Sequence, residues 1–98
     1  MEYTFESELF EWQGKASWFF VTLPPVAAEE IKEISNGLTN GFGSVRVDVS
    51  VGPSQWRTSI FPHSKVGSYM LPIKQEVRKI NRLATGDSLT ATIKLVDF

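Results

Sequence analysis

Residues 55–79 read QWRTSIFPHSKVGSYMLPIKQEVRK, and two prolines within this stretch decide how the chain is divided. Residues 55–61 are rich in β-forming side chains, and Pro62 follows them directly. Residues 68–71 form a shorter apolar run, which Pro72 closes. Because proline has no backbone N–H to donate, we expect each strand to end at its proline. The stretch therefore predicts a strand, a loop, a short strand and then a helix.

A hairpin is predicted where this stretch begins. Residues 45–51, VRVDVSV, alternate valine with polar side chains, which is typical of a strand buried on one face. Gly52-Pro53-Ser54 is a turn signal, so residues 55–61 are expected to be the partner strand. Alternation assigns the side chains of this partner to two faces: Trp56, Thr58 and Ile60 on one, and Gln55, Arg57, Ser59 and Phe61 on the other.

A helix and a final strand are predicted after Pro72. Apolar residues recur there at spacings of four, three and four, the pattern of one buried helix face. They are Ile73, Val77, Ile80 and Ala84. Thr85-Gly86-Asp87 is expected to end the helix, with Gly86 as its left-handed cap. Residues 88–95 then alternate apolar and polar side chains, which predicts the last strand.

The first predicted strand changes phase in its middle. Its apolar side is carried first by Tyr3, Phe5, Ser7 and Leu9, and after Leu9 by Phe10 and Trp12. A phase change of one residue predicts a bulge, which helps a sheet to curl into a barrel. Residues 13–15 are the expected turn after this strand.

Residues 17–44 predict a central strand, a helix and a glycine-rich turn. Residues 17–23, SWFFVTL, are apolar on both faces, and Pro24-Pro25 stops them. A helix is expected from Pro25, ending at Asn36-Gly37 or Asn40-Gly41. Its apolar stripe is Ala27, Ile31, Ile34 and Leu38. Residues 41–44, GFGS, favour a turn with a buried Phe42 over a phosphate-binding loop, because no helix follows them.

Together these elements predict one mainly β domain over residues 1–98. About six strands and two short helices fit a small β-barrel, closed or split, with helices covering its ends. Closure would also leave few unpaired strand edges exposed. The length of 98 residues supports one hydrophobic core rather than two.

Composition excludes several classes of site and favours a soluble protein. The chain has no cysteine and one histidine, so disulfides, thiolate chemistry and cysteine-based zinc sites are excluded. We find no metal-ligand spacing and predict no cofactor. The first residues do not form a secretory signal, and no apolar run approaches the 18 or so residues of a membrane span. We therefore expect a cytoplasmic protein.

The net charge of −1 hides an asymmetry between the two halves of the chain. Residues 1–50 carry three basic and eight acidic side chains, a net charge of −5. Residues 51–98 carry seven basic and three acidic side chains, a net charge of +4. This division permits an anion-binding face, although a polarised but merely solvated surface is an equal alternative.

The motifs of this chain, in their order, resemble those of the family called domain of unknown function 1905. The resemblance spans essentially the whole chain and implies a small, six-stranded split-barrel fold without an established activity. It is carried by Trp18-Phe19-Phe20-Val21 with Leu23-Pro24, Gly41–Val45 as GFGSV, residues 56–62 as WRTSIFP, Tyr69, residues 71–74 as LPIK, Val77-Arg78-Lys79 and Gly86-Asp87.

The last third of the chain also resembles, more weakly, the swapped-hairpin motif of AbrB-like transition-state regulators. The similar residues are Leu71-Pro72, Lys74, Val77-Arg78 and Gly86-Asp87, followed by an alternating strand. This resemblance implies an intertwined dimer that binds DNA through basic residues. The same short motif also has a purely structural explanation: proline ends a strand, a helix follows, glycine caps the helix and the last strand returns.

The leading functional hypothesis is a binding module without catalytic activity. Arg57 and Ser59 face together on their strand, and Tyr69, Lys74 and Arg78 could join them around a small anionic ligand. Guanidinium and hydroxyl donors suit phosphate or carboxylate, and tyrosine or tryptophan rings could form an apolar wall. The alternative is structural: Arg57 extends into solvent and Ser59 satisfies local backbone groups.

Two further hypotheses involve a macromolecular partner. Lys74, Arg78, Lys79 and Arg82 could form a basic helix face that binds DNA, against which stands the acidic pI of about 5.8. An interaction domain could instead dock a protein on an open face bearing Trp12 or Phe98, as a monomer or a homodimer.

An enzyme is the least favoured hypothesis. Ser59 and His63 are four residues apart, one in a predicted strand and one in a predicted loop, which does not make them a nucleophile and its base. The carboxylates gather on the predicted outer faces of the first strand and the first helix. No cofactor or metal requirement is expected.

Overall fold

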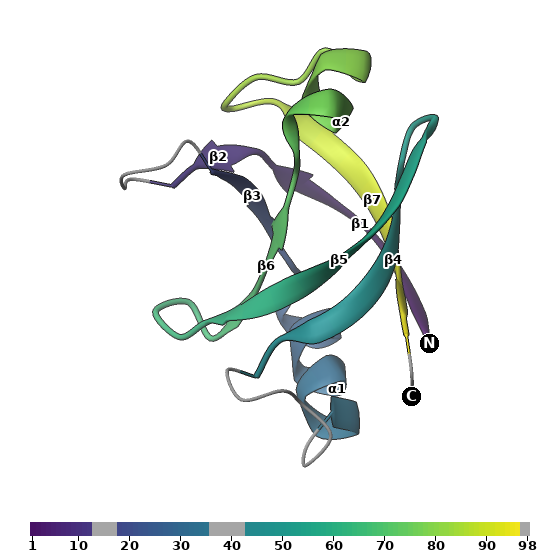
Figure 1. Ribbon diagram of the computed structural model, residues 1–98. Helices are drawn as coiled ribbons and strands as arrows, with labels where there is room; N and C mark the ends of the chain where they lie inside the picture. The colour runs from purple at the N-terminus through teal and green to yellow at the C-terminus, as the bar shows by residue number, and fades with distance from the viewer. Residues whose placement is uncertain (13–17, 36–42, 97–98) are drawn as a thin grey trace.

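The protein folds as one curled antiparallel sheet with a helix at each end (Figure 1). The computed structural model describes residues 1–12, 18–35 and 43–96. In chain order the elements are β1 (Glu2–Glu8), β2 (Phe10–Glu11), β3 (Phe19–Thr22), α1 (Pro25–Ser35), β4 (Val45–Val51), β5 (Ser54–His63), β6 (Ser68–Pro72), α2 (Gln75–Ile80) and β7 (Ser88–Leu95). The strands lie in the order β1-β7-β4-β5-β6-β3-β2. The predicted mainly β, barrel-like class with two short helices is confirmed.

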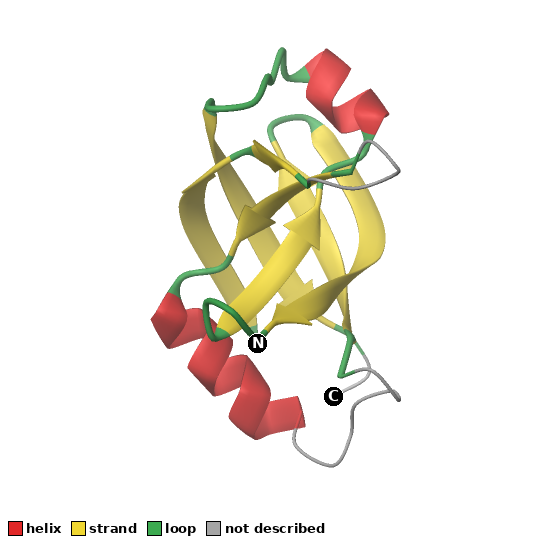
Figure 2. Ribbon diagram, turned by 90° about the vertical axis from the view of Figure 1, so that its left-hand side faces the viewer, coloured by secondary structure: helices red, strands yellow, loops and turns green. Residues whose placement is uncertain are grey.

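The two edge strands of this sheet, β1 and β2, are neighbours in sequence, and only Leu9 separates them. Strand β1 pairs with β7, whereas β2 pairs with β3. Leu9 is fully buried; its N–H donates to the carbonyl of Asp87, and its carbonyl accepts from the N–H of Gly86, both at 2.9 Å. The predicted phase change at Leu9 is thus a change of partner, and it curls the sheet into a half-barrel of seven strands rather than six (Figure 2).

The concave side of the half-barrel holds one apolar core. Strand β4 contributes four valines from alternate positions, as predicted, and β7 contributes four apolar residues in the same way. Strand β6 is buried along most of its length. The largest fully buried side chains are Leu9, Val21, Leu23, Ile31, Val45, Val47, Ile60, Leu71, Ile73, Val77 and Ile93.

Strand β5 does not end at Pro62, as the sequence suggested. It continues to His63, and Pro62 is paired in register with Tyr69 of β6. The ladder between β5 and β4 has already ended at the pair Val45–Ile60. Beyond that point β5 has β6 as a neighbour on one side only, so a residue without an N–H is tolerated there.

Helix α2 is also shorter than predicted. It ends at Ile80, because Arg82 adopts a left-handed conformation with φ of 53°. The N–H of Leu83 donates to the carbonyl of Arg78 at 2.8 Å, and that of Arg82 to the carbonyl of Lys79 at 3.2 Å. These two bonds form a Schellman motif with arginine in the position that glycine usually occupies.

This early ending changes the roles of three predicted helix residues. Ile80 is 61% exposed and Ala84 is exposed, so the predicted apolar stripe holds only for Ile73 and Val77. Gly86 does have a positive φ of 96°, but it belongs to the turn before β7 and not to a helix end.

Helix α1 begins at Pro25, as expected, and buries Ala27 and Ile31. The hydroxyl of Tyr3 on β1 donates to Glu30 of this helix at 3.2 Å. The predicted turn at residues 13–15, the predicted helix end at residues 36–41, Leu38, Phe42 and Phe98 lie outside the described residues.

Candidate functional site

A cleft opens where β5 and β6 separate, and it is named here the β5–β6 cleft. The pairs that join these strands run from Phe61–Met70 to His63–Ser68, at one end of β5. Toward its other end β5 pairs with β4, while β6 continues to Pro72 beside β3 and leads into α2. The resulting cleft has a volume of about 450 Å³. Its lining residues are Trp18, Phe19, Trp56, Arg57, Thr58, Pro72, Ile73, Lys74, Gln75 and Arg78.

The β5–β6 cleft brings together three of the five residues predicted to bind an anion. Arg57 comes from β5, Lys74 from the link between β6 and α2, and Arg78 from α2. No aspartate or glutamate is among the lining residues in the described parts of the chain. The cleft therefore combines positive charge from three separate elements.

The other two predicted residues do not line this cleft. Tyr69 is 7% exposed and packs in the apolar core, because alternation along β6 turns it to the concave side. Ser59 lies on the same outer face of β5 as Arg57, as predicted, opposite Arg46 of β4. Of the five predicted residues, the three cations line the cleft, whereas Ser59 and Tyr69 do not. That these residues bind an anion stays a prediction.

Arg57 is held by an acidic neighbour on the next strand. Its Nε lies 2.8 Å from Oδ1 of Asp48, and its Nη2 lies 3.4 Å from Oδ2. The hydrogen bond from Arg57 lowers the pKa of Asp48 below its usual value of 3.8. Asp48 compensates part of the charge of Arg57, so Lys74 and Arg78 supply most of the uncompensated charge of the cleft.

Arg78 is fixed in position by two contacts. The centre of its guanidinium lies 3.8 Å from the centroid of the Phe19 ring. Its Nε donates to the carbonyl of Ile73 at 3.1 Å. Within the described segments no carboxylate forms an ion pair with Arg78 or Lys74. The guanidinium is thus ordered before any ligand arrives, which reduces the entropy lost on binding.

The aromatic wall of the cleft comes from tryptophan and phenylalanine rings in or next to predicted strands. Trp18 precedes β3 and Phe19 begins it, whereas Trp56 lies on β5 and is partly buried against the core. For Trp18 and Phe19 the sequence does contain a signal, because residues 17–23 are apolar on both faces. An aromatic residue on the outer face of such a strand is either covered by another part of the chain or forms part of an interaction surface.

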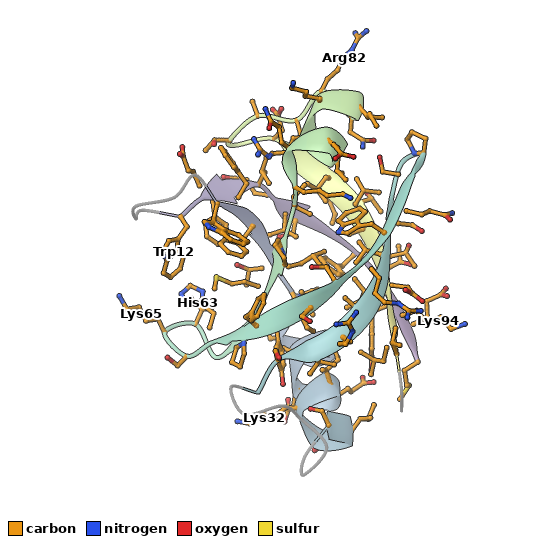
Figure 3. All side chains as sticks on the ribbon, in the orientation of Figure 1. Trp12, Lys32, His63, Lys65, Arg82 and Lys94 are labelled. Atoms are coloured by element: carbon orange, nitrogen blue, oxygen red, sulfur yellow. The ribbon has the colours of Figure 1, made fainter. Side chains whose placement is uncertain are left out.

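An outer aromatic cluster extends from the cleft across β2 and β3. The Phe20 ring lies 6.0 Å from that of Phe10, 6.1 Å from that of Trp12 and 6.0 Å from that of Trp18. His63 meets Trp12 edge-on with 5.6 Å between centroids, and Figure 3 shows the two rings side by side. Trp12 is 41% exposed, which agrees with its predicted place on an open face.

The residues considered for catalysis are not brought together. Ser59 and His63 are four residues apart on one extended strand, which corresponds to about 13 Å between their Cα atoms. Among residues 1–12, 18–35 and 43–96, no three His, Asp or Glu side chains are placed to hold a metal ion. In the same residues no helix is long and apolar enough to cross a membrane.

The basic stripe predicted along one helix is interrupted. Lys74 precedes α2, Arg78 and Lys79 lie within it, and Arg82 lies beyond its end. Arg82 extends away from the body of the protein at the α2 end (Figure 3). The premise of a continuous helix is wrong, while DNA binding itself stays an untested prediction.

The family described as "Domain of unknown function (DUF1905)" matches residues 5–93. No curated protein matches the chain.

Proposed function

The chain belongs to the family described as Domain of unknown function (DUF1905). For this member we propose a non-catalytic binding domain that holds a small anionic ligand in the β5–β6 cleft. The observation that carries this proposal is the convergence of Arg57, Lys74 and Arg78 on a cleft without acidic lining residues in the described chain. Cationic donors from several elements around one cavity suit the recognition of phosphate or carboxylate.

Two other clefts differ from it in charge. The cleft beside α1 has a volume of about 850 Å³ and is lined by Glu29, Lys32 and Glu33 together with Tyr69 and His63. The cleft across β4 and β5 includes Glu2 and Asp48 among its lining residues. An anion entering either of these would meet carboxylates, so the β5–β6 cleft is the better electrostatic match.

The size and the donors of the β5–β6 cleft suit a small ligand. Its volume of about 450 Å³ falls within the roughly 300–1,000 Å³ of small-molecule sites. A hydrogen bond between a charged donor and an anion contributes about 1.5–3 kcal/mol, so Lys74 and Arg78 could each change affinity by roughly tenfold or more.

Titration with inorganic phosphate and with acetate at low ionic strength tests this proposal. We expect the amide signals of Arg57, Lys74 and Arg78 to shift in NMR spectra of the labelled protein. Lys74→Gln and Arg78→Gln should each weaken binding roughly tenfold. Lys79→Gln is the matched control, because Lys79 is an exposed cation of α2 that does not line the cleft.

Equal losses in all three variants would contradict the proposal, because they would indicate a response to overall charge alone. Signals that shift only elsewhere, or no response to either anion, would also contradict it. Shifts confined to α2 and seen only with duplex DNA would favour the DNA-binding hypothesis instead.

A further inference from the structure

Trp18 is an aromatic side chain with one face packed and much of its surface open. It is 52% exposed although its ring stacks on Phe20, with 6.0 Å between centroids and 10° between planes. Trp18 also lines the β5–β6 cleft beside Lys74 and Arg78. The indole is therefore held flat by Phe20 next to two cations without paired carboxylates in the described chain.

Two further rings line the same cleft. Phe19 carries the guanidinium of Arg78 on its face, and Trp56 approaches from β5. Three aromatic and three cationic side chains thus line one cavity. A flat ring gains from both kinds of wall, by stacking on indole and by contact with a guanidinium plane.

We infer that the ligand of the β5–β6 cleft carries a flat aromatic ring joined to a phosphate or carboxylate. The ring lies on Trp18, and the anionic group lies at Lys74 and Arg78. This inference rests on the proposed function, since it assigns a ligand class to the same cleft. Nucleotides and aryl phosphates share the required chemistry.

Trp12 provides a control from within the same aromatic cluster. Like Trp18 it is exposed and packs on Phe20, with ring centroids 6.1 Å apart. Unlike Trp18 it does not line the cleft, and its ring also meets His63 edge-on. Trp12→Leu and Trp18→Leu therefore remove the same type of exposed ring, but only the second removes cleft wall.

Two matched ligand pairs test the inference. Phenyl phosphate and methyl phosphate differ in the ring, and so do adenosine 5′-monophosphate and ribose 5-phosphate. The dissociation constant of each is measured by NMR titration at one fixed low ionic strength. Stacking of a ring on an aromatic side chain predicts that the ring-bearing member of at least one pair binds roughly five- to hundredfold tighter. A preference in the first pair indicates an aryl phosphate, and a preference in the second pair indicates a nucleotide.

The variants then locate the ring. Trp18→Leu should reduce the preference for the ring-bearing ligand to within twofold, and Trp12→Leu should retain it. Well-dispersed amide spectra of both variants establish that they are folded. A preference that survives Trp18→Leu, or that both variants remove equally, would overturn the inference.

Failure of the inference and failure of the proposed function give different results. If both members of each pair bind equally, the anion site is supported and the aromatic ligand class is wrong. If none of the four compounds shifts the signals of Arg57, Lys74 or Arg78, the proposed anion site is wrong as well.

Discussion

The hydroxyl of Ser7 on β1 donates a hydrogen bond of 2.9 Å to the carbonyl of Thr22 at the end of β3. These strands lie near opposite edges of the sheet, separated by the whole row of strands from β7 to β6. The bond therefore spans the seam of the half-barrel, and it is partly buried. Together with Leu9 it keeps the two edges of the sheet close.

Removing this bond is expected to weaken the closure of the sheet. Ser7→Ala leaves the carbonyl of Thr22 without its side-chain donor and should lower the free energy of unfolding by about 1 kcal/mol. Urea unfolding followed by fluorescence measures the change. Thr4→Ala is the control, because Thr4 forms a comparable but exposed bond to Thr92 at 2.9 Å. A loss in Thr4→Ala as large as in Ser7→Ala would contradict a special role for the seam.

Arg82→Gly is expected to stabilise the protein. The positive φ of 53° costs a side chain with a Cβ roughly 1 kcal/mol, and glycine removes that cost at the position where the Schellman motif prefers it. The larger freedom of glycine in the unfolded chain offsets part of the gain. Thermal unfolding should show a higher midpoint for Arg82→Gly, whereas Arg82→Ala, which removes the charged part of the side chain but keeps the Cβ, should not. Equal effects of the two variants would show that charge, and not backbone conformation, decides.

The β4–β5 turn packs against the end of α2 in a way that only glycine permits. A Cβ at Gly52 would overlap Oδ1 of Asn81, and the backbone there has φ of 55°. The amide nitrogen of Asn81 donates to the hydroxyl of Ser54 at 3.2 Å and to the carbonyl of Val77 at 2.9 Å, so this side chain is not free to move away. Gly52→Ala should therefore cost about 2 kcal/mol or more.

Gly67→Ala separates the steric part of this cost from the conformational part. Gly67 has a similar φ of 65°, but nothing lies within 4 Å of the added Cβ. It should cost only about 1 kcal/mol in chemical denaturation. A Gly52→Ala variant no less stable than Gly67→Ala would mean that Asn81 does not restrict the turn.

The pKa of Tyr3 is raised above its usual value of 10.0, chiefly by burial and further by the carboxylate of Glu30. A group whose pKa is higher in the folded state contributes stability that is present below pH 10 and lost as the pH rises through the folded pKa. The free energy of unfolding should therefore fall above pH 10 in the wild type. Tyr3→Phe should flatten this part of the pH profile, and an unchanged slope would contradict the assignment to Tyr3.

Arg78→Lys is expected to weaken anion binding although it keeps the charge. Lysine lacks the planar group that stacks on Phe19 and the Nε that donates to the carbonyl of Ile73. The phosphate affinity should fall by roughly threefold to tenfold, less than for Arg78→Gln. Unchanged affinity in Arg78→Lys would show that only the positive charge at position 78 matters for binding, and not the shape of the guanidinium group.

The sequence predicts the sheet well where one face of a strand meets the core. The alternation of apolar and polar residues is enough to predict the buried valines of β4 and the change of phase at Leu9. The point at which β5 ends depends instead on whether β4 or β6 still pairs with it at Pro62. This follows from the register of β4, β5 and β6 and cannot be read from the sequence. The end of α2 depends on a left-handed arginine, a conformation that no propensity favours.

The site could be predicted only in part for a related reason. Arg57, Lys74 and Arg78 were identified as cations of one neighbourhood, and the separation of β5 from β6 brings them to one cleft. Tyr69 is predicted to join the same ligand, whereas the structure places its ring in the apolar core. Trp18 and Trp56 became cleft wall through strand order, which is not visible in a single sequence.

The position of Leu9 also separates two steps of folding in time. Strand β2 finds its partner β3 nearby, since Glu11 pairs with Phe19, and little loop entropy opposes that contact. Strand β1 has to wait for β7, since Glu8 pairs with Ser88. On a ribosome the first strand would thus remain exposed until nearly all of these residues have emerged. One buried leucine divides an early local event from a late one that brings distant parts of the chain together.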